Sequence, residues 1–315
     1  MERRKKKGPN RKRHIPEYLP YVSYLKFDEC IGHGHFSHVY RGTYHQKEEV
    51  AIKLIERGSE YLINNEVKIL QTLKGAPHVV QLYEVIEKEE TMLVFELLKG
   101  IDPNHLFEQF TVNRIRFLIR SVLQALDAAH SLGIVHRDVK LGNILIMHNF
   151  TDVKLIDWGC GCFANEDMSS KAGSRHCRPP EMLLGYTNYG YGCDVWAVGV
   201  LIFYILTHGD IPWKARSSPQ TLIIMSEYFG GNELDRIADQ IGIQIDDDID
   251  DEFVDEPIKS LESAFAPELS QIVDEGLVDL MKTLLNIDYT KRPTAKEALN
   301  HPFLKDQTNP PTIIK

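Results

Sequence analysis

Asp138, Lys140 and Asn143 stand close together in the middle of the chain, and Asp157 follows after a short interval. Moving a phosphoryl group from a nucleotide to a hydroxyl needs a carboxylate that orients and deprotonates the hydroxyl, and oxygen ligands that hold magnesium. Asp138 would be that carboxylate, with Lys140 neutralising the moving charge, while Asn143 and Asp157 would bind the metal. Such residues also form turns, but the complete pattern HRDxKxxN with a later DxG favours catalysis.

Two glycines, Gly32 and Gly34, lie between strand-like segments near the start of the chain. They permit a tight turn whose backbone amides can approach a phosphate. The signal is weak by itself, because glycine hairpins are common and Ser37 stands where a third glycine would complete GxGxxG. Its value rises because a strand with a lysine follows.

Ala51 and Lys53 share one face of that following strand, since strand side chains alternate. A small residue there leaves room for an adenine ring, and the ammonium would reach its phosphates, although a lone strand lysine is more often exposed. Glu66 lies in the apolar stripe of a predicted helix, between Leu62 and Leu70. A buried carboxylate needs a partner, and Lys53 is the expected one.

Several other residues are predicted to support the site without touching substrate. His136 and Trp158 should pack beside the catalytic residues. Asp194 opens an apolar helix, where it could cap the helix and also brace the catalytic loop. Glu181 and Arg292 are expected to form a buried ion pair that anchors the end of the segment between the DxG motif and Pro180.

The chain has 315 residues, 43% of them hydrophobic, which suits one large domain or two smaller lobes. The longest apolar run, 195–206, is too short to cross a bilayer, so no membrane partner is expected. The five cysteines include no CxxC pair, which indicates reduced thiols rather than a disulfide framework or a zinc site.

Charge is unevenly distributed along the chain, whose net charge is −9. Residues 3–13 are almost wholly basic and 246–256 are mostly acidic. Both runs are typical of solvated, irregular chain. For the basic arm, nuclear import or contact with nucleic acid or an acidic partner is as well supported as solvated chain without function. Overall acidity argues against DNA binding by the folded body.

Hydrophobic periodicity divides the chain into a β-rich part and an α-rich part that meet near 96–100. Strands are expected at 27–31, 39–43, 50–55, 80–85 and 91–95, with one helix at 59–73 that Ser59 would cap. Later helices are expected at 112–132, 194–207, 276–285 and 295–299. Residues 214–268 show little pattern and are predicted to be a less ordered insertion.

Together these motifs resemble the eukaryotic serine/threonine protein kinases over residues 26–305. The resemblance implies an α+β, bilobal protein kinase fold and an enzyme that uses ATP and Mg²⁺. It divides the chain into an irregular basic arm (1–25), a small β-rich N-lobe (26–97), a larger α-helical C-lobe (98–305, with the insertion at about 214–268) and a tail (306–315). It implies ATP contacts by Ile31, Gly32, Gly34, Val39, Ala51, Lys53, Glu66, Glu96, Leu98, Leu145 and Ile156.

Two kinase families share particular motifs with this chain. The casein kinase II catalytic subunit is similar around 66–77, 125–134 and Leu155-Ile156-Asp157-Trp158-Gly159. The cell division control protein 7 kinase is similar in 15–17, 32–40 and 172–181. We favour the latter, because 59–65 lacks the lysine cluster of the former, although the usual long inserts are absent. It implies a role in DNA replication initiation and the cell cycle, with an activating subunit, in nucleus and/or cytoplasm.

Both relatives act on acidic protein substrates, and Lys171, Arg175 and Arg178 give a reason to expect the same here. They lie in the segment that would contact residues after the target hydroxyl, unless they simply face solvent. That segment contains no threonine or tyrosine between Asp157 and Glu181. We therefore expect it to be ordered constitutively or by a regulatory subunit. A pseudokinase scaffold is the alternative of another class, which the complete set of catalytic residues disfavours.

Overall fold

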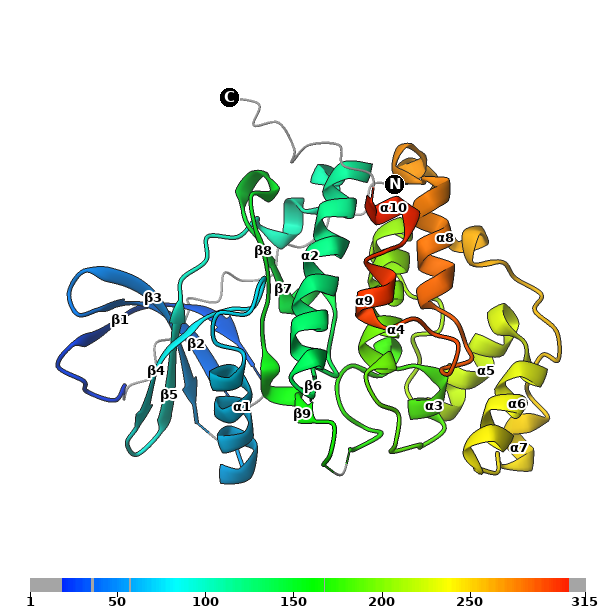
Figure 1. Cartoon of the computed structure of the whole chain (residues 1–315), viewed down its shortest axis with the longest axis horizontal. Helices are drawn as coiled ribbons and strands as arrows, with labels where there is room; N and C mark the ends of the chain where they lie inside the picture. Colours follow the sequence, from blue (N-terminus) through cyan, green and yellow to red (C-terminus); the bar gives the residue numbers. More distant parts are fainter. Residues whose placement is uncertain (1–18, 35–36, 57, 167, 306–315) are drawn as a thin grey trace, which may run out of the picture. The chain divides into compact units, whose positions relative to one another are not determined.

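The computed structural model describes residues 19–34, 37–56, 58–166 and 168–305 (Figure 1). These form two compact units. Among the described residues, the first contains those up to Ile63 together with Gln81–Leu98, and the second contains Asn64–Val80 and those from Lys99 to Lys305. The basic run 3–13, the motif at 15–17 and the tail 306–315 lie outside the described residues.

The first unit is built on a five-stranded antiparallel sheet in the order β1-β2-β3-β5-β4. Its strands are β1 (Leu25–His33), β2 (Ser37–Tyr44), β3 (Glu48–Ile55), β4 (Leu82–Glu87) and β5 (Thr91–Glu96). All five predicted strands are confirmed. Val50, Ile52 and Leu54 alternate into a buried cluster on one face of the sheet, so Ala51 and Lys53 share the opposite face, as period-two patterning predicts.

Helix α1 (Glu60–Thr72) starts at the predicted cap, where Ser59 Oγ accepts a hydrogen bond from Leu62 N at 3.2 Å. Glu66, Ile69 and Leu70 are buried as expected. Leu62, however, is 51% exposed, so its place in the buried stripe was wrongly predicted. Periodicity gives the direction of a stripe, but it does not say how far along the helix the packing extends.

Most of α1 belongs to the second unit, whereas the sequence division assigned the whole of 26–97 to one lobe. The reason is local bonding. Asn65 Nδ2 donates to Gly161 O at 2.9 Å, and the Lys68 ammonium lies over the Phe163 ring. Val80 N then donates to Leu155 O. Residues 64–80 are therefore tied to the segment around the DxG motif.

The second unit is mainly helical. Its longer helices are α2 (Val112–Ser131), α4 (Gly192–Leu206), α5 (Ser218–Phe229), α6 (Gly231–Ile241) and α8 (Glu275–Leu284), and its short ones are α3 (Pro180–Leu183), α7 (Asp247–Asp250), α9 (Ala295–Ala298) and α10 (Pro302–Lys305). Nearly every side chain of α4 is buried, which confirms the predicted central helix. Within the described residues no helix has the length and apolarity needed to cross a membrane.

The insertion 214–268 is more regular than predicted. It holds α5, α6 and α7, and α5 and α6 bury Leu222, Met225, Leu234 and Ile237. Both helices bury apolar side chains, so the expectation of low order was wrong. The acidic run itself forms the short, exposed α7 and its flanks.

Two small antiparallel ribbons carry the catalytic segments. β6 (Ile134–Val135) pairs with β9 (Cys162–Phe163), and β7 (Ile144–Ile146) pairs with β8 (Val153–Leu155). The loop after β6 and the loop after β8 contain the HRD and DxG motifs. All five cysteines are free thiols, as predicted.

Candidate active site

Asp194 braces the catalytic loop from the first turn of α4. Its two carboxylate oxygens accept hydrogen bonds from His136 N (2.8 Å) and Arg137 N (2.7 Å), and His130 Nε2 lies 3.0 Å away. Burial favours a raised pKa for Asp194, but hydrogen bonding and charge from His130 and His136 hold that pKa below its ordinary value. The predicted brace is confirmed. The predicted N-cap is wrong, because Tyr191 occupies that position.

His136 links the catalytic loop to the DxG segment. Its Nδ1 accepts a hydrogen bond from Asp138 N (3.2 Å), and Nε2 lies 3.1 Å from Ile156 O, which assigns the proton to Nε2. The ring packs edge-on against Trp158 with centroids 4.6 Å apart. Both residues are fully buried, so the predicted packing role is confirmed.

Asp138 is surrounded by donors. Its Oδ2 accepts from Lys140 Nζ at 2.7 Å and Asn143 Nδ2 at 2.9 Å, while Oδ1 accepts from Ser174 N at 2.8 Å. Burial raises the pKa of Asp138, but the hydrogen bonds from Lys140 and Ser174 outweigh this and the pKa stays below its ordinary value. Asp138 is therefore an ionised acceptor at neutral pH.

Ser174 is a site residue that the motif analysis did not identify. Besides its backbone bond to Asp138, its Oγ lies 2.9 Å from Lys140 Nζ. The preceding Gly173 has φ +67°, and a Cβ there would come within 1.9 Å of Arg137 O. The Gly-Ser dipeptide is the only sequence signal for this contact, and such dipeptides are common in loops.

Asn143 and Asp157 are brought together by the β7–β8 ribbon. Ile144 pairs with Leu155, and Ile156 N donates to Asn143 O at 2.9 Å, which leaves Asp157 one residue beyond. Asn143 Nδ2 also donates to Asp138 O, so the remaining polar atom of the side chain is an oxygen. An amide oxygen and a carboxylate fit Mg²⁺, which binds few protein oxygens and takes its other ligands from phosphates and water.

Glu66 approaches the DxG motif within the second unit. A Cβ built at Gly159 would lie 3.3 Å from Glu66 Oε2 and 3.5 Å from Asp157 Oδ1. The glycine therefore leaves room for both carboxylates. Glu66 is 5% exposed. Its pairing with Lys53 stays a prediction, because Lys53 belongs to the first unit.

Three of the predicted nucleotide residues in the first unit lie on one face of the sheet. Gly32 pairs with Val39, and Val39 pairs with Lys53. Because directly opposed residues share a face, Val39, Ala51 and Lys53 all lie on the face away from the buried cluster. Gly34 N donates to Ser37 O at 2.7 Å and narrows the turn. His35 and Phe36 lie outside the described residues.

The other predicted nucleotide contacts occur at three places. Ile31 is 43% exposed on β1, and Glu96 and Leu98 end the first unit. Leu145 is partly exposed in β7 between buried neighbours, and Ile156, directly after β8, is partly exposed. Their contacts with adenine stay predictions.

The three predicted substrate cations differ in their surroundings. Arg178 donates from Nε to Ala172 O and from Nη2 to Gly173 O, both at 2.8 Å. Arg175 donates to Arg216 O at 2.7 Å, and Lys171 is exposed. Burial, with the charge of Arg175, lowers the pKa of Arg178. Both arginines thus hold the backbone of this segment in place by hydrogen bonds and also give the segment positive charge.

The buried ion pair between Glu181 and Arg292 is confirmed. Arg292 Nη1 lies 2.8 Å from Glu181 Oε1, and Nη2 lies 3.2 Å from Oε2. Neither side chain is exposed. Arg292 also donates to Gly192 O, and its guanidinium lies over the Trp196 ring. The pair ties the start of α3 to the start of α4.

A model of the protein kinase domain matches residues 25–304. The chain belongs to the protein kinase family. It is 33% identical over 290 residues to casein kinase II subunit alpha' of Saccharomyces cerevisiae, covering 90% of this chain and 85% of that protein. It is also 31% identical over 282 residues to a probable serine/threonine-protein kinase of Dictyostelium discoideum, covering 88% of this chain and 47% of that protein.

These similarities identify an ATP-dependent serine/threonine protein kinase with the α+β fold of that family. The predicted fold class and enzyme class are therefore confirmed. Kinases of this family use ATP and Mg²⁺.

Proposed function

We propose that this kinase phosphorylates serine or threonine in acidic protein segments and is of the casein kinase II alpha type. The observation that carries the proposal is the bond between Ser174 N and Asp138 Oδ1 at 2.8 Å. It holds the segment with Lys171, Arg175 and Arg178 against the catalytic carboxylate. Cations there would favour carboxylate side chains near the target hydroxyl.

The chemistry follows from the arrangement around Asp138. The hydroxyl oxygen of the substrate would attack the γ-phosphorus of ATP, and the bond from that phosphorus to the β–γ bridging oxygen would break, releasing ADP. Asp138 would orient the hydroxyl and take its proton. Lys140, which lies 2.7 Å from Asp138 Oδ2, would offset charge on the phosphoryl group.

Asn143 and Asp157 would hold Mg²⁺, which supplies electrostatic stabilisation of the phosphates when bound. Lys53 would contact the α- and β-phosphates, with Glu66 as its partner. Gly32 and Gly34 would let the β1–β2 turn approach the phosphates. The remaining predicted residues would surround adenine: Ile31, Val39, Ala51, Glu96, Leu98, Leu145 and Ile156.

Similarity to casein kinase II subunit alpha' supports that family over the replication kinase. The replication role, the cell-cycle role and the nuclear location therefore rest on motif resemblance alone. A regulatory subunit remains part of the proposal, because the segment from Asp157 to Glu181 offers only serines for phosphorylation. If this kinase contacts nucleic acid, we expect the contact to be made only by its basic arm.

Peptides that carry one serine in acidic, neutral or basic surroundings test the proposal. We expect the highest kcat/KM for the acidic peptide, and we expect Arg175→Ala with Arg178→Ala to lower that value more than the value for the neutral peptide. Equal kcat/KM for all three peptides, or equal losses of kcat/KM for the acidic and neutral peptides in the variant, would contradict a preference for acidic substrates.

A further inference from the structure

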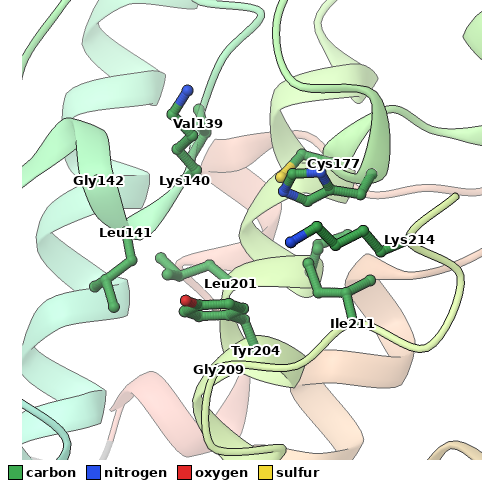
Figure 2. A pocket seen from close by; sticks show the side chains of 12 residues that line it. Val139, Lys140, Leu141, Gly142, Cys177, Leu201, Tyr204, Gly209, Ile211 and Lys214 are labelled. Atoms are coloured by element: carbon green, nitrogen blue, oxygen red, sulfur yellow. The ribbon is translucent and has the colours of Figure 1, made fainter. Parts of the chain in front are cut away.

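A cavity of about 170 Å³ opens beside the catalytic loop, entirely within the second unit (Figure 2). One wall is formed by 139–142, the residues that directly follow Asp138. The opposite wall comes from α4 and from the loop that leaves it. The side chains most relevant to its chemistry are Leu201, Tyr204, Ile211 and Lys214.

Lys214 gives this cavity its charge. Its ammonium end points between Tyr204 and Cys177 (Figure 2), and no described carboxylate forms an ion pair with it. Lys140 also lines the cavity, but its ammonium is engaged by Asp138 and Ser174. Burial and the charges of Lys214 and Lys140 lower the pKa of His176, so that wall residue is neutral at pH 7 and adds no cation.

The loop that carries Lys214 is held on both sides. Trp213 Nε1 donates to His176 O at 3.0 Å, and Arg175 Nη1 donates to Ala215 O at 3.2 Å. Lys214 lies between these two anchors. Its backbone is therefore fixed relative to the segment that holds Asp138, which is what a specificity residue requires.

Part of the wall near this ammonium is apolar, beside the polar groups of Lys140, His176 and Tyr204. Leu201 and Ile211 are buried at the base of the cavity, and Tyr204 presents its ring. Gly142 adds no side chain, and even a Cβ there would meet only Lys140 Cε at 3.9 Å. A short aliphatic stem that ends in an anion matches both features, because methylene carbons gain from burial while the carboxylate pairs with the lysine.

We propose that this cavity is a substrate subsite that receives a glutamate side chain close to the target residue, with Lys214 as its charge partner. The cavity adjoins Asp138, and an extended peptide advances about 3.3–3.6 Å per residue, so the glutamate lies within a few positions of the phosphorylated serine. The inference rests on the proposed acid-directed function, and it adds a subsite separate from Lys171, Arg175 and Arg178.

The test uses serine peptides with a neutral background, in which glutamate, alanine, leucine or arginine replaces each neighbouring residue in turn. The readout is the ratio of kcat/KM between the glutamate and alanine peptides at each position. In wild type we expect a glutamate preference at several positions. Lys214→Ala should reduce it about three- to tenfold at one position only. Lys214→Glu should favour arginine at that same position.

Lys296→Ala is the matched control, because it removes an exposed lysine from α9, outside the cavity; its ratios should equal those of wild type. Glutamate preferences that persist at every position in both Lys214 variants would overturn the subsite but leave the acid-directed function intact. No glutamate preference anywhere in wild type would overturn both. A leucine preference that Lys214→Ala leaves unchanged would show an apolar subsite instead and would also overturn the proposal.

Discussion

The ammonium of Lys140 lies 2.9 Å from the hydroxyl oxygen of Ser174, and its other partner is the Asp138 carboxylate. Ser174 thereby fixes the cation that we propose offsets charge during phosphoryl transfer. Catalytic groups act through position as well as type. The Ser174 hydroxyl, as a second acceptor for the Lys140 ammonium, should therefore affect kcat.

Replacement of Ser174 tests this relationship. Ser174→Ala should lower kcat about tenfold or more, because a hydrogen bond to a charged group contributes about 1.5–3 kcal/mol. Ser174→Thr retains the hydroxyl and should keep most of the activity. Steady-state kinetics at saturating ATP would measure both, and equal rates for alanine and serine would remove the positioning role.

Gly173 is required by backbone conformation and by space. Gly173→Ala would place a Cβ 1.9 Å from Arg137 O at a φ of +67°, so we expect loss of the Ser174–Asp138 bond and a fall in kcat of about a hundredfold. Gly190 has a similar φ of +63° with nothing within 4 Å of its Cβ position. Gly190→Ala should therefore cost only about 1 kcal/mol in the free energy of unfolding, with kcat near wild type.

Asp194 should make stability depend on pH. Its folded-state pKa lies below the ordinary value of 3.8, so the ionised carboxylate stabilises the fold above that value, and the benefit is lost as pH falls through the lowered pKa. Asp194→Asn should lower the free energy of unfolding by about 3 kcal/mol at neutral pH. The free energy of unfolding of this variant should also fall less on acidification than that of wild type.

Urea titrations from neutral pH to below 3.8 would measure this. Asp248→Asn, an exposed change in α7, serves as the control and should follow wild type. If the free energy of unfolding of Asp194→Asn falls with pH in parallel with that of wild type, Asp194 is not the source of the pH dependence.

The Glu181–Arg292 pair predicts strong coupling between two distant positions in the sequence. Either Glu181→Leu or Arg292→Met alone should destabilise by about 3–5 kcal/mol, because each leaves a buried charge without its partner. The double variant should lose less than the sum of the two. A double-mutant cycle of unfolding free energies measures this coupling, and simple additivity would mean that the buried pair is not energetically linked.

The proposed catalytic set could be recognised in the sequence because phosphoryl transfer constrains residue type and spacing together. Asp138, Asn143 and Asp157 occur where one short ribbon and two loops bring them together. The Glu181–Arg292 pair could also be predicted, since buried charges need partners. The division into a β-rich and an α-rich part followed from the change of period from two to 3.6 after the fifth strand, and the fold class followed from the resemblance to the protein kinases.

Other features depend on tertiary contacts that no local pattern encodes. Ser174 contacts Lys140 across 34 positions of sequence, and its dipeptide resembles any loop. Leu62 continues an apolar period beyond the part of α1 that is buried. Helices α5 and α6 were missed because low order was inferred from the composition of 214–268 as a whole, which hides the apolar stripe of α6 at Leu234, Ile237 and Ala238.

The central claim is that Asp138 is the acceptor in phosphoryl transfer from ATP to a protein hydroxyl. The most direct measurement is single-turnover transfer of labelled γ-phosphate to an acidic serine peptide by wild type and Asp138→Asn, with nucleotide binding measured separately. We expect transfer by wild type, and a loss of about 10²–10⁴-fold in the variant with nucleotide binding retained. Equal transfer by both proteins, or none by wild type with any regulatory subunit supplied, would contradict the account.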